Sequence, residues 1–232
     1  MIKRLNKLFY GVSLSDFQCI FALTEKDCES NILDCYSGPA SFNAELTALG
    51  GKVISIDPLY AEPVENIEKI ASESLDKQLS DWHDNPENFS STKFSSPESY
   101  IEDRKKHLMQ FLLDLPIGLK QQRYQTKSFQ DLNFPDFHFD LALCSNDLFT
   151  SSSTQSVDYY LNMIKKLCGF AKEVRIFPMI NSVGEVSSLL GPVILALSQS
   201  DYGVEVKSVD YKIEKDANTM LRVWAQTCTV SS

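Results

Sequence analysis

The chain has 232 residues, of which 43% are hydrophobic and 23% are charged. This composition suits one compact domain with its own core and excludes disordered, collagen-like and coiled-coil chains. The 31 Asp and Glu residues outnumber the 22 Lys and Arg residues, which leaves a net charge of -9. Such a charge repels phosphate backbones, so it disfavours a nucleic acid partner and favours a neutral or cationic small molecule.

The N-terminus and the cysteines indicate the compartment. Polar residues at positions 13, 15, 16 and 18 interrupt the first apolar run before a signal-peptide core or a membrane span forms. We therefore expect a cytoplasmic protein with no membrane partner. The six cysteines, at positions 19, 28, 35, 144, 168 and 228, form no CxxC pair and have no His at zinc-ligand spacing. We expect reduced, mostly buried thiols, with neither a disulfide framework nor a metal site.

The first quarter of the chain predicts a βαβ unit. Within an N-terminal helical segment over residues 1–30, apolar residues at helical spacing follow a Ser cap and predict a helix over 14–23. A short apolar run at 31–35 stops at a turn that contains Gly38 and Pro39. A helix over 42–49 and a β-branched strand over 52–57 follow. Two strands joined by a helix predict a parallel sheet.

A helical insertion follows the second strand. Residues 60–120 are more than one crossover helix needs, since such connections usually take about a dozen residues. They contain a helical pattern over 64–82, a polar loop, and a second helical pattern that Ser96-Pro97-Glu98 opens and that we expect to end near Pro116.

The alternation of strand and helix then resumes. Strands are expected at 122–127, 139–144 and 173–177, with a helix over 157–167 before the last of these. Strands at 204–211 and 219–226 end the chain as an antiparallel hairpin. No repeat or linker divides the chain, so we expect one α/β domain over 1–232. Its core is a doubly wound, mostly parallel, seven-stranded Rossmann-like sheet with a C-terminal antiparallel hairpin.

The residues after the first two strands indicate a ligand site. Open parallel sheets bind ligands beyond the carboxyl ends of their strands. Asp57 comes nineteen positions after Gly38, which suits an acid that accepts hydrogen bonds from ribose hydroxyls. Tyr36 and Ala40 occupy two of the three glycine positions of a dinucleotide motif, and Asp34 would repel a pyrophosphate. S-adenosylmethionine, with an ammonium, a sulfonium and no phosphate, suits this turn better.

Several segments resemble small bacterial members of the class I S-adenosylmethionine-dependent methyltransferases. Residues 32–42, ILDCYSGPASF, are similar to the family's first motif, hydrophobic-Leu-Asp-x-Gly-x-Gly-x-Gly, and residues 53–58 resemble its second. Residues 132–145 and 173–178 are similar to its fourth and fifth strands. The resemblance covers residues 31–178. It implies S-adenosylmethionine as cofactor and S-adenosylhomocysteine as product, with the 60–120 insertion as a lid over the acceptor.

The resemblance also implies roles for particular residues. Asp34 would face the methionine ammonium, and Asp57 would hold the ribose hydroxyls. Ser128 stands where the family commonly has an Asp that bonds the adenine amino group, and the backbone amide of Phe129 would meet the ring. The implied cofactor-binding residues are Asp34, Cys35, Tyr36, Ser37, Gly38, Pro39, Ala40, Asp57, Pro58, Leu59, Ser128, Phe129 and Ser145.

The methyl acceptor is expected beyond the fourth strand and under the insertion. The substrate candidates are Tyr60, Trp82, Tyr100, Asn146 and Asp147. No residue is assigned as a catalytic base, because methyl transfer depends largely on alignment and exclusion of water. His107 shares a helical face with Tyr100 and Phe111 and is interpreted as a packed histidine.

Three functions and one purely structural interpretation stay open. The first function is methyl transfer from S-adenosylmethionine to a small-molecule acceptor. The second is a catalytically inactive binding module, because Tyr36, Ala40 and Ser128 depart from the family's pattern. The third is an NAD-dependent oxidoreductase, which Asp57 fits but Asp34 and the missing glycines disfavour. A structural turn, with Asp57 capping a helix that starts at Pro58, explains the same residues without a ligand.

Overall fold

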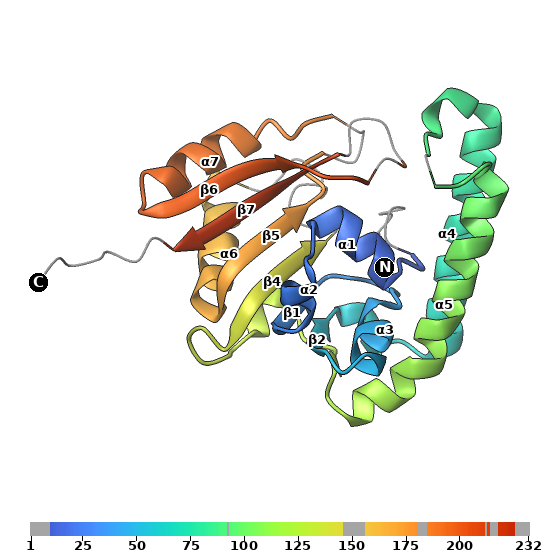
Figure 1. The fold of residues 1–232 in the computed structure, drawn as a ribbon, viewed down its shortest axis with the longest axis horizontal. Helices are drawn as coiled ribbons and strands as arrows, with labels where there is room; N and C mark the ends of the chain where they lie inside the picture. The colour runs from blue at the N-terminus through green and yellow to red at the C-terminus, as the bar shows by residue number, and fades with distance from the viewer. Residues whose placement is uncertain are drawn as a thin grey trace, which may run out of the picture.

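The computed structural model describes residues 10–91, 93–145, 156–180, 185–211, 213 and 218–225, and within these ranges a seven-stranded sheet forms the centre of the molecule (Figure 1). The strand order is β3-β2-β1-β4-β5-β7-β6. The strands are β1 (Asn31–Cys35), β2 (Lys52–Ile56), β3 (Tyr124–Gln125), β4 (Phe139–Ser145), β5 (Ala171–Phe177), β6 (Tyr202–Ser208) and β7 (Thr219–Ala225). Neighbouring strands from β3 to β5 pair in parallel, whereas β7 is antiparallel to both β5 and β6. This confirms the doubly wound sheet and its C-terminal hairpin.

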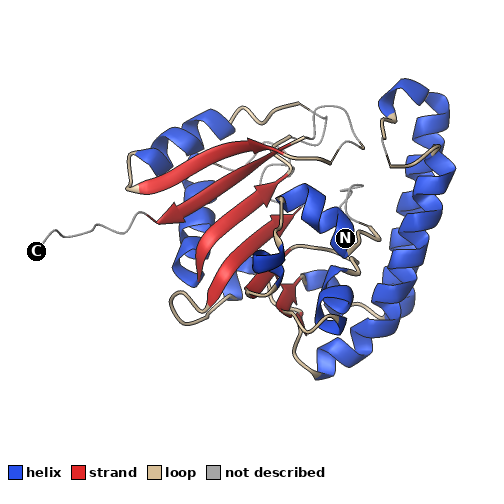
Figure 2. Cartoon of the chain, in the orientation of Figure 1, coloured by secondary structure: helices blue, strands red, loops and turns tan. Residues whose placement is uncertain are grey.

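Helices cover both faces of this sheet (Figure 2). The α-helices are α1 (Leu14–Phe21), α2 (Glu25–Cys28), α3 (Phe42–Ala48), α4 (Val64–Asp84), α5 (Pro97–Lys120), α6 (Val157–Phe170) and α7 (Leu190–Ser198). Short 3-10 turns are η2 (Pro58–Ala61), η3 (Pro86–Asn88) and η4 (Phe129–Asp131). None of the helices in the described ranges combines the length and the hydropathy of a membrane span.

Two apolar clusters make up the core. The first joins the sheet to α1, α3, α4 and α5, and the second joins it to η4, α6 and α7. Strands β1 and β4 lie at the centre of the sheet and are buried over nearly their whole length. Their apolar runs are what a parallel strand covered on both faces requires. Edge strand β6 is mostly exposed.

The N-terminal segment is attached to both the sheet and the turn after β1. Ser13 caps α1 in a reciprocal pair with Asp16, which satisfies two of the free backbone donors at the helix start. At the other end of α1, the guanidinium of Arg175 on β5 donates to the carbonyl of Phe21 at 2.9 Å. Ahead of the helix, Gly11 N–H donates to the Pro39 carbonyl at 3.0 Å. Residues 10–13 therefore lie directly on the turn.

The insertion folds as a long antiparallel pair of helices, α4 and α5, beside α1 and α3 (Figure 1). The expectation that the second helix ends near Pro116 is wrong, because α5 continues to Lys120. A proline removes one backbone donor, but it lies in the last turns of the helix and is itself exposed. Leu115 and Gly118 are buried on either side of it, so packing maintains the helix.

Other boundaries differ from the sequence-based expectation. The strand expected at 122–127 is reduced to Tyr124 and Gln125, because β3 is an edge strand that pairs only with the end of β2. Helix α2 has four residues, which is too short for a periodic pattern. Helix α7 was not expected, because Gly191 and Pro192 near its start are typical of a turn. Of the described cysteines, Cys35, Cys144 and Cys168 are buried, Cys28 is half-buried and Cys19 is exposed.

Gly11→Ala tests the attachment of the N-terminal segment. A Cβ at Gly11 would lie 1.9 Å from the Arg104 carbonyl oxygen, and its φ of +63° adds left-handed strain. We expect the free energy of unfolding in urea to fall by about 3 kcal/mol or more. Two matched variants separate the causes. Gly50→Ala has a positive φ but open space and should cost about 1 kcal/mol, and Gly169→Ala should cost nothing. Equal effects of all three would contradict the close contact.

Candidate functional site

The turn after β1 has two left-handed residues. Tyr36 has a φ of 58° and Gly38 a φ of 60°. A glycine adopts this conformation freely, whereas a tyrosine carries strain there of about 1 kcal/mol. The turn is held against β2 by a hydrogen bond of 2.8 Å from Tyr36 N–H to the Ile56 carbonyl. All positions from 36 to 41 are buried.

Asp57 joins the turn after β1 to the end of β2. Its Oδ2 accepts a hydrogen bond from Gly38 N–H at 3.1 Å, and its Oδ1 accepts one from Leu59 N–H at 2.8 Å. The second contact caps the 3-10 turn that begins at Pro58, as the structural interpretation expects.

Tyr60 closes the turn from the same side. Its hydroxyl donates to the Gly38 carbonyl at 2.9 Å and lies 2.9 Å from the Ser37 Oγ. The side chain is 2% exposed, with its ring edge-on to Tyr124. Residues 57–60 therefore bind both the amide and the carbonyl of Gly38, which brings the substrate candidate Tyr60 to the turn after β1.

Asp34 at the end of β1 is buried, and serine hydroxyls lie beside its carboxyl group. Its Oδ2 accepts a hydrogen bond of 2.8 Å from the hydroxyl of Ser55, which faces it in the β1–β2 register. Its Oδ1 has no hydrogen-bond partner among the residues that the structure describes. Burial raises the pKa of Asp34 to about 7, and the Ser37 and Ser55 hydroxyls offset part of that rise. No cation among the described residues supplies a counter-charge to this carboxyl.

A polar chain links Asp34 to the insertion. The amide of Asn43 on α3 donates to Ser55 Oγ at 3.0 Å, and its oxygen accepts from Arg123 Nη1 at 2.6 Å. Arg123 in turn binds both carboxylate oxygens of Asp114 on α5. The position of Asp34 is thus fixed by contacts that extend across α3 to the end of α5. The sequence analysis did not identify Ser55 or Asn43. The signal that could have found them is a polar residue within an otherwise apolar strand or helix next to Asp34, since Ser55 lies in β2 and Asn43 in α3.

Four of the implied cofactor-binding residues lie around the Tyr36 ring and the nearby strand ends. The ring of Tyr36 lies parallel to that of Phe129 with centroids 6.2 Å apart, and both are buried in the second core cluster. Ser128 donates its hydroxyl to Asp131, so a carboxylate lies beside the position where the family has an acid. Ser145 Oγ, at the end of β4, donates to the Tyr36 carbonyl at 3.3 Å.

Other expected residues are not brought to the turn. Trp82 and Tyr100 pack edge-to-face with centroids 5.2 Å apart. Trp82 lies eighteen residues along α4 from Val64, about 27 Å from the end of the helix near the turn. Asn146 and Asp147 lie outside the described residues.

A half-buried ion pair lies behind the turn. His107 Nδ1 is 2.9 Å from Glu45 Oε1 and 3.1 Å from Ser41 Oγ. The hydrogen bond and charge of Glu45 raise the pKa of His107. These contacts join α5 to α3, so the interpretation of His107 as a packed residue fits the structure. No group of three His, Cys, Asp or Glu side chains in the described ranges could hold a metal ion.

Comparison with known proteins supports the fold. No protein-family model matches the chain. The uncharacterized protein MJ0045 of Methanocaldococcus jannaschii is 27% identical over 219 residues, which are 93% of this chain and 95% of that protein. Among solved structures, WbdD in complex with the kinase inhibitor LY294002 has a TM-score of 0.51 at 10% identity, and the match covers 91% of this chain and 40% of that chain. Magnesium protoporphyrin IX methyltransferase of Synechocystis PCC 6803, with bound SAM, has a TM-score of 0.43 at 10% identity and covers 85% and 70%.

The sheet itself decides the fold. Its order is β3-β2-β1-β4-β5-β7-β6, with β7 antiparallel to both of its neighbours, and this agrees with the mostly parallel, seven-stranded sheet and C-terminal hairpin expected from the sequence. The chain has a doubly wound, Rossmann-like α/β fold with a C-terminal antiparallel hairpin. In this fold the turn after β1 and the acid after β2 lie together at the carboxyl edge of the sheet, where ligands of open α/β sheets bind.

Asp34→Asn tests the burial of the uncompensated carboxyl. An unfolded Asp loses its proton near pH 4, whereas folded Asp34 keeps it up to about pH 7. Folding stability therefore falls as the pH rises through this window, by about 1.4 kcal/mol per pH unit. The Asn side chain does not titrate, so the variant does not show this loss. Its free energy of unfolding, relative to that of the unaltered chain, should therefore rise by about 2 to 3 kcal/mol between pH 5 and pH 8. Urea unfolding of both proteins at the two pH values measures this change, and a constant difference would show that Asp34 is already ionised at pH 5.

Proposed function

We propose that the protein is an S-adenosylmethionine-dependent methyltransferase that acts on a small-molecule acceptor. The observation that carries this proposal is the pair of buried acids at adjacent strand ends. Asp34 holds an unpartnered oxygen, and Asp57 binds the backbone of the intervening turn. A cationic amine would supply the counter-charge that Asp34 lacks, and this is the end of the cofactor that the turn must hold.

The residues present fit this cofactor. Asp34 would bind the ammonium, and Asp57, at the end of β2 beside the turn, would accept hydrogen bonds from the ribose hydroxyls. Leu59 and Phe129, both buried, would border the adenine. When bound, S-adenosylmethionine supplies a methyl group on a sulfonium whose departure leaves a neutral thioether. The chain's task is then to orient the acceptor and to exclude water, and no described residue needs to act as a base.

The amine and the ribose can be tested separately. S-adenosylhomocysteine has both groups, whereas 5′-methylthioadenosine has the ribose but not the amino acid. We expect Asp57→Asn to weaken both ligands, and Asp34→Asn to weaken S-adenosylhomocysteine about tenfold or more without changing 5′-methylthioadenosine. Titration calorimetry measures both affinities.

A surface acid provides the control for this experiment. Asp76→Asn removes a carboxylate whose contact is with Lys105 on the outer side of the helical pair, so it should alter neither affinity. NADH serves as the competing ligand class. Binding of NADH in preference to S-adenosylhomocysteine, or equal weakening of both adenosyl ligands by Asp34→Asn, would overturn the assignment of Asp34.

Cofactor affinity should also depend on pH. Because the pKa of Asp34 is raised to about 7, its carboxyl is increasingly neutral below pH 7 and attracts an ammonium less. Affinity for S-adenosylhomocysteine should thus fall by up to about tenfold per unit as the pH drops from 7 to 6, and fall again above about pH 8 as the ligand amine loses its proton. Binding of 5′-methylthioadenosine, measured in parallel, should show neither change. An affinity profile common to both ligands would point to a different group.

A second candidate is a binding module with the same cofactor site but no turnover. Two observations favour it: Tyr36 occupies a left-handed position with a side chain, and the Tyr60 hydroxyl is bonded to Ser37 and Gly38. Release of S-adenosylhomocysteine from S-adenosylmethionine across a panel of oxygen, nitrogen, sulfur and carbon acceptors distinguishes the two candidates. Binding without any release supports the module.

A further inference from the structure

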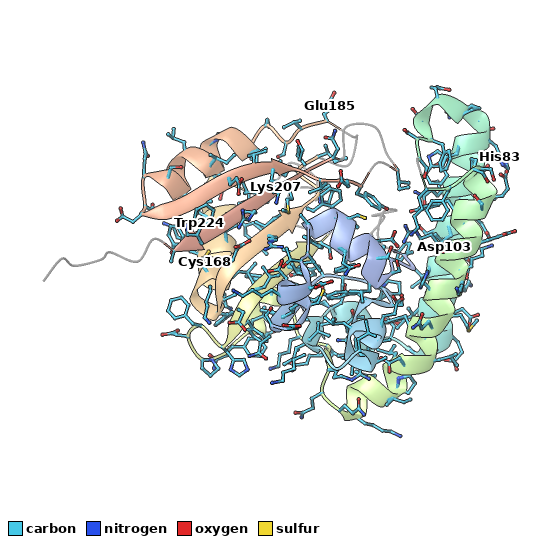
Figure 3. All side chains as sticks on the ribbon, viewed as in Figure 1. His83, Asp103, Cys168, Glu185, Lys207 and Trp224 are labelled. Carbon is cyan, nitrogen blue, oxygen red and sulfur yellow. The ribbon has the colours of Figure 1, made fainter. Side chains whose placement is uncertain are left out.

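Arg104 on α5 is the most deeply buried charged residue of the described chain. Its side chain is 0% exposed. Nη1 donates to Asp16 Oδ2 at 2.6 Å and to the Gly11 carbonyl at 3.1 Å, and the guanidinium lies 4.5 Å from the centre of the Tyr100 ring. These contacts place the cation between α1, α5 and the segment that rests on the cofactor turn. Figure 3 labels Asp103, which precedes it on α5, on the side of the helix pair nearest α1.

Three buried donors around Arg104 make no hydrogen bond to a described residue. We call Asp16, Lys93, Tyr100, Arg104 and Tyr211 the Arg104 cluster. Arg104 Nε, Arg104 Nη2 and the hydroxyl of Tyr211 have no hydrogen-bond partner among the described residues. The Tyr211 side chain lies beside Tyr100 and Arg104, close enough for electrostatic interaction with both. Buried polar groups in native proteins are nearly always paired, so several unpaired donors at one place require an explanation.

The other described arginines show that this is unusual for the chain. Arg123, Arg175 and Arg222 each donate through all three guanidinium nitrogens to carboxylates, carbonyls or an amide. The guanidinium groups of these three arginines therefore have all of their nitrogens bound within the fold, as expected of structural residues. Arg104 differs because it is more deeply buried than any of them and uses one nitrogen of three.

The cluster also has an excess of positive charge. Lys93 Nζ lies 3.3 Å from Asp16 Oδ1, so two cations face one carboxylate. Burial alone would raise the pKa of Asp16, but the charge of Arg104 and its hydrogen bond hold that pKa far below the usual range. Asp16 therefore stays ionised and is fully engaged. The Lys93 side chain is half exposed, which puts the cluster one side chain away from solvent.

The cluster lies at the edge of the sheet where a second substrate must approach. The Tyr211 ring is edge-on to that of Phe177, at the carboxyl end of β5, with centroids 5.9 Å apart. The tip of the helix pair reaches the same region, since Ser90 N–H donates to the Ile213 carbonyl at 3.4 Å. From Arg104, the Gly11 peptide leads directly to Pro39 in the cofactor turn.

We propose that Arg104 and Tyr211 bind an oxyanion, a carboxylate or a phosphate, carried by the methyl acceptor. A planar guanidinium with two free nitrogens, Nε and Nη2, matches the paired oxygens of either group, and the Tyr211 hydroxyl supplies a third donor. That the anion belongs to a methyl acceptor rests on the proposed function, whereas the anion site itself is independent of it. The anion enters as Lys93 turns outward, and its charge balances the excess of the cluster.

The test is a thermal melt of the full chain with sodium phosphate, sodium acetate or sodium chloride at equal ionic strength. We expect phosphate or acetate, at saturating concentration, to raise the Tm by about 2 to 4 °C above chloride. A rise with phosphate alone assigns a phosphate group, and a rise with acetate alone assigns a carboxylate. If neither anion exceeds chloride, the proposal is wrong.

Tyr211→Phe is the decisive variant. It removes a hydroxyl that has no hydrogen-bond partner among the described residues, so a purely structural tyrosine would leave the Tm unchanged or raise it slightly. We expect the variant to fold and to lose the anion-dependent rise. Arg104→Lys, which keeps a cation for Asp16 but not the planar fork, should lose it as well. An unchanged rise in Tyr211→Phe would mean that the anion binds elsewhere.

Two controls isolate this result. Tyr160→Phe alters a buried tyrosine in the second core cluster and should keep the full anion effect. S-adenosylhomocysteine binding to Tyr211→Phe should equal that of the unaltered chain. If the unaltered chain shows the anion effect but does not bind S-adenosylhomocysteine, the methyltransferase proposal is refuted and the anion site stands. If the unaltered chain binds S-adenosylhomocysteine but shows no anion effect, the anion site is refuted and the methyltransferase proposal stands.

Discussion

The carboxylate of Asp57 is the contact on which the geometry of the site depends. It lies at the end of one strand and accepts the amide of Gly38, which belongs to the turn after the neighbouring strand. Parallel pairing of β1 and β2 brings both strand ends to one edge, and this hydrogen bond then fixes how the turn faces its surroundings. Tyr60, from the same short segment, holds the carbonyl of that glycine. A turn with a tyrosine in a glycine position is kept in shape by these contacts.

The same turn explains why two interpretations of function compete. A methyltransferase needs this turn to be open to the amino acid end of its cofactor. Asp34 lies there, and its Oδ1 has no hydrogen-bond partner among the described residues. The Tyr60 hydroxyl meanwhile contacts Ser37, a position that the resemblance gives to the cofactor. A buried carboxyl with a raised pKa lowers the stability of the fold, and such groups cluster at binding and catalytic sites. That physical argument favours a binding site over a structural turn.

Much of the fold could be predicted from local patterns. Apolar runs followed by a glycine turn and a helix indicated a parallel sheet, and the ends of the first two runs placed Asp34 and Asp57 at its carboxyl edge. Helix α7 could not be predicted in this way, because its Gly-Pro start resembles a turn and only burial of Val193 and Leu197 against the sheet maintains it. Arg104 could not be recognised either. Among the charges of a long amphipathic helix it resembles a solvated residue, and its burial depends on Asp16, eighty-eight positions earlier.

Gly11 contacts both candidate binding regions, the turn after β1 and the buried guanidinium of Arg104. Its N–H bonds the Pro39 carbonyl and its own carbonyl accepts from Arg104, so one residue contacts both the turn after β1 and the buried guanidinium. The lack of a side chain is what lets it fit there, since a Cβ would overlap the backbone of α5. Two ligands that each order one side of this peptide would be thermodynamically coupled and reciprocal in effect, with no movement of the sheet required. Heterotropic cooperativity would then follow from a single glycine.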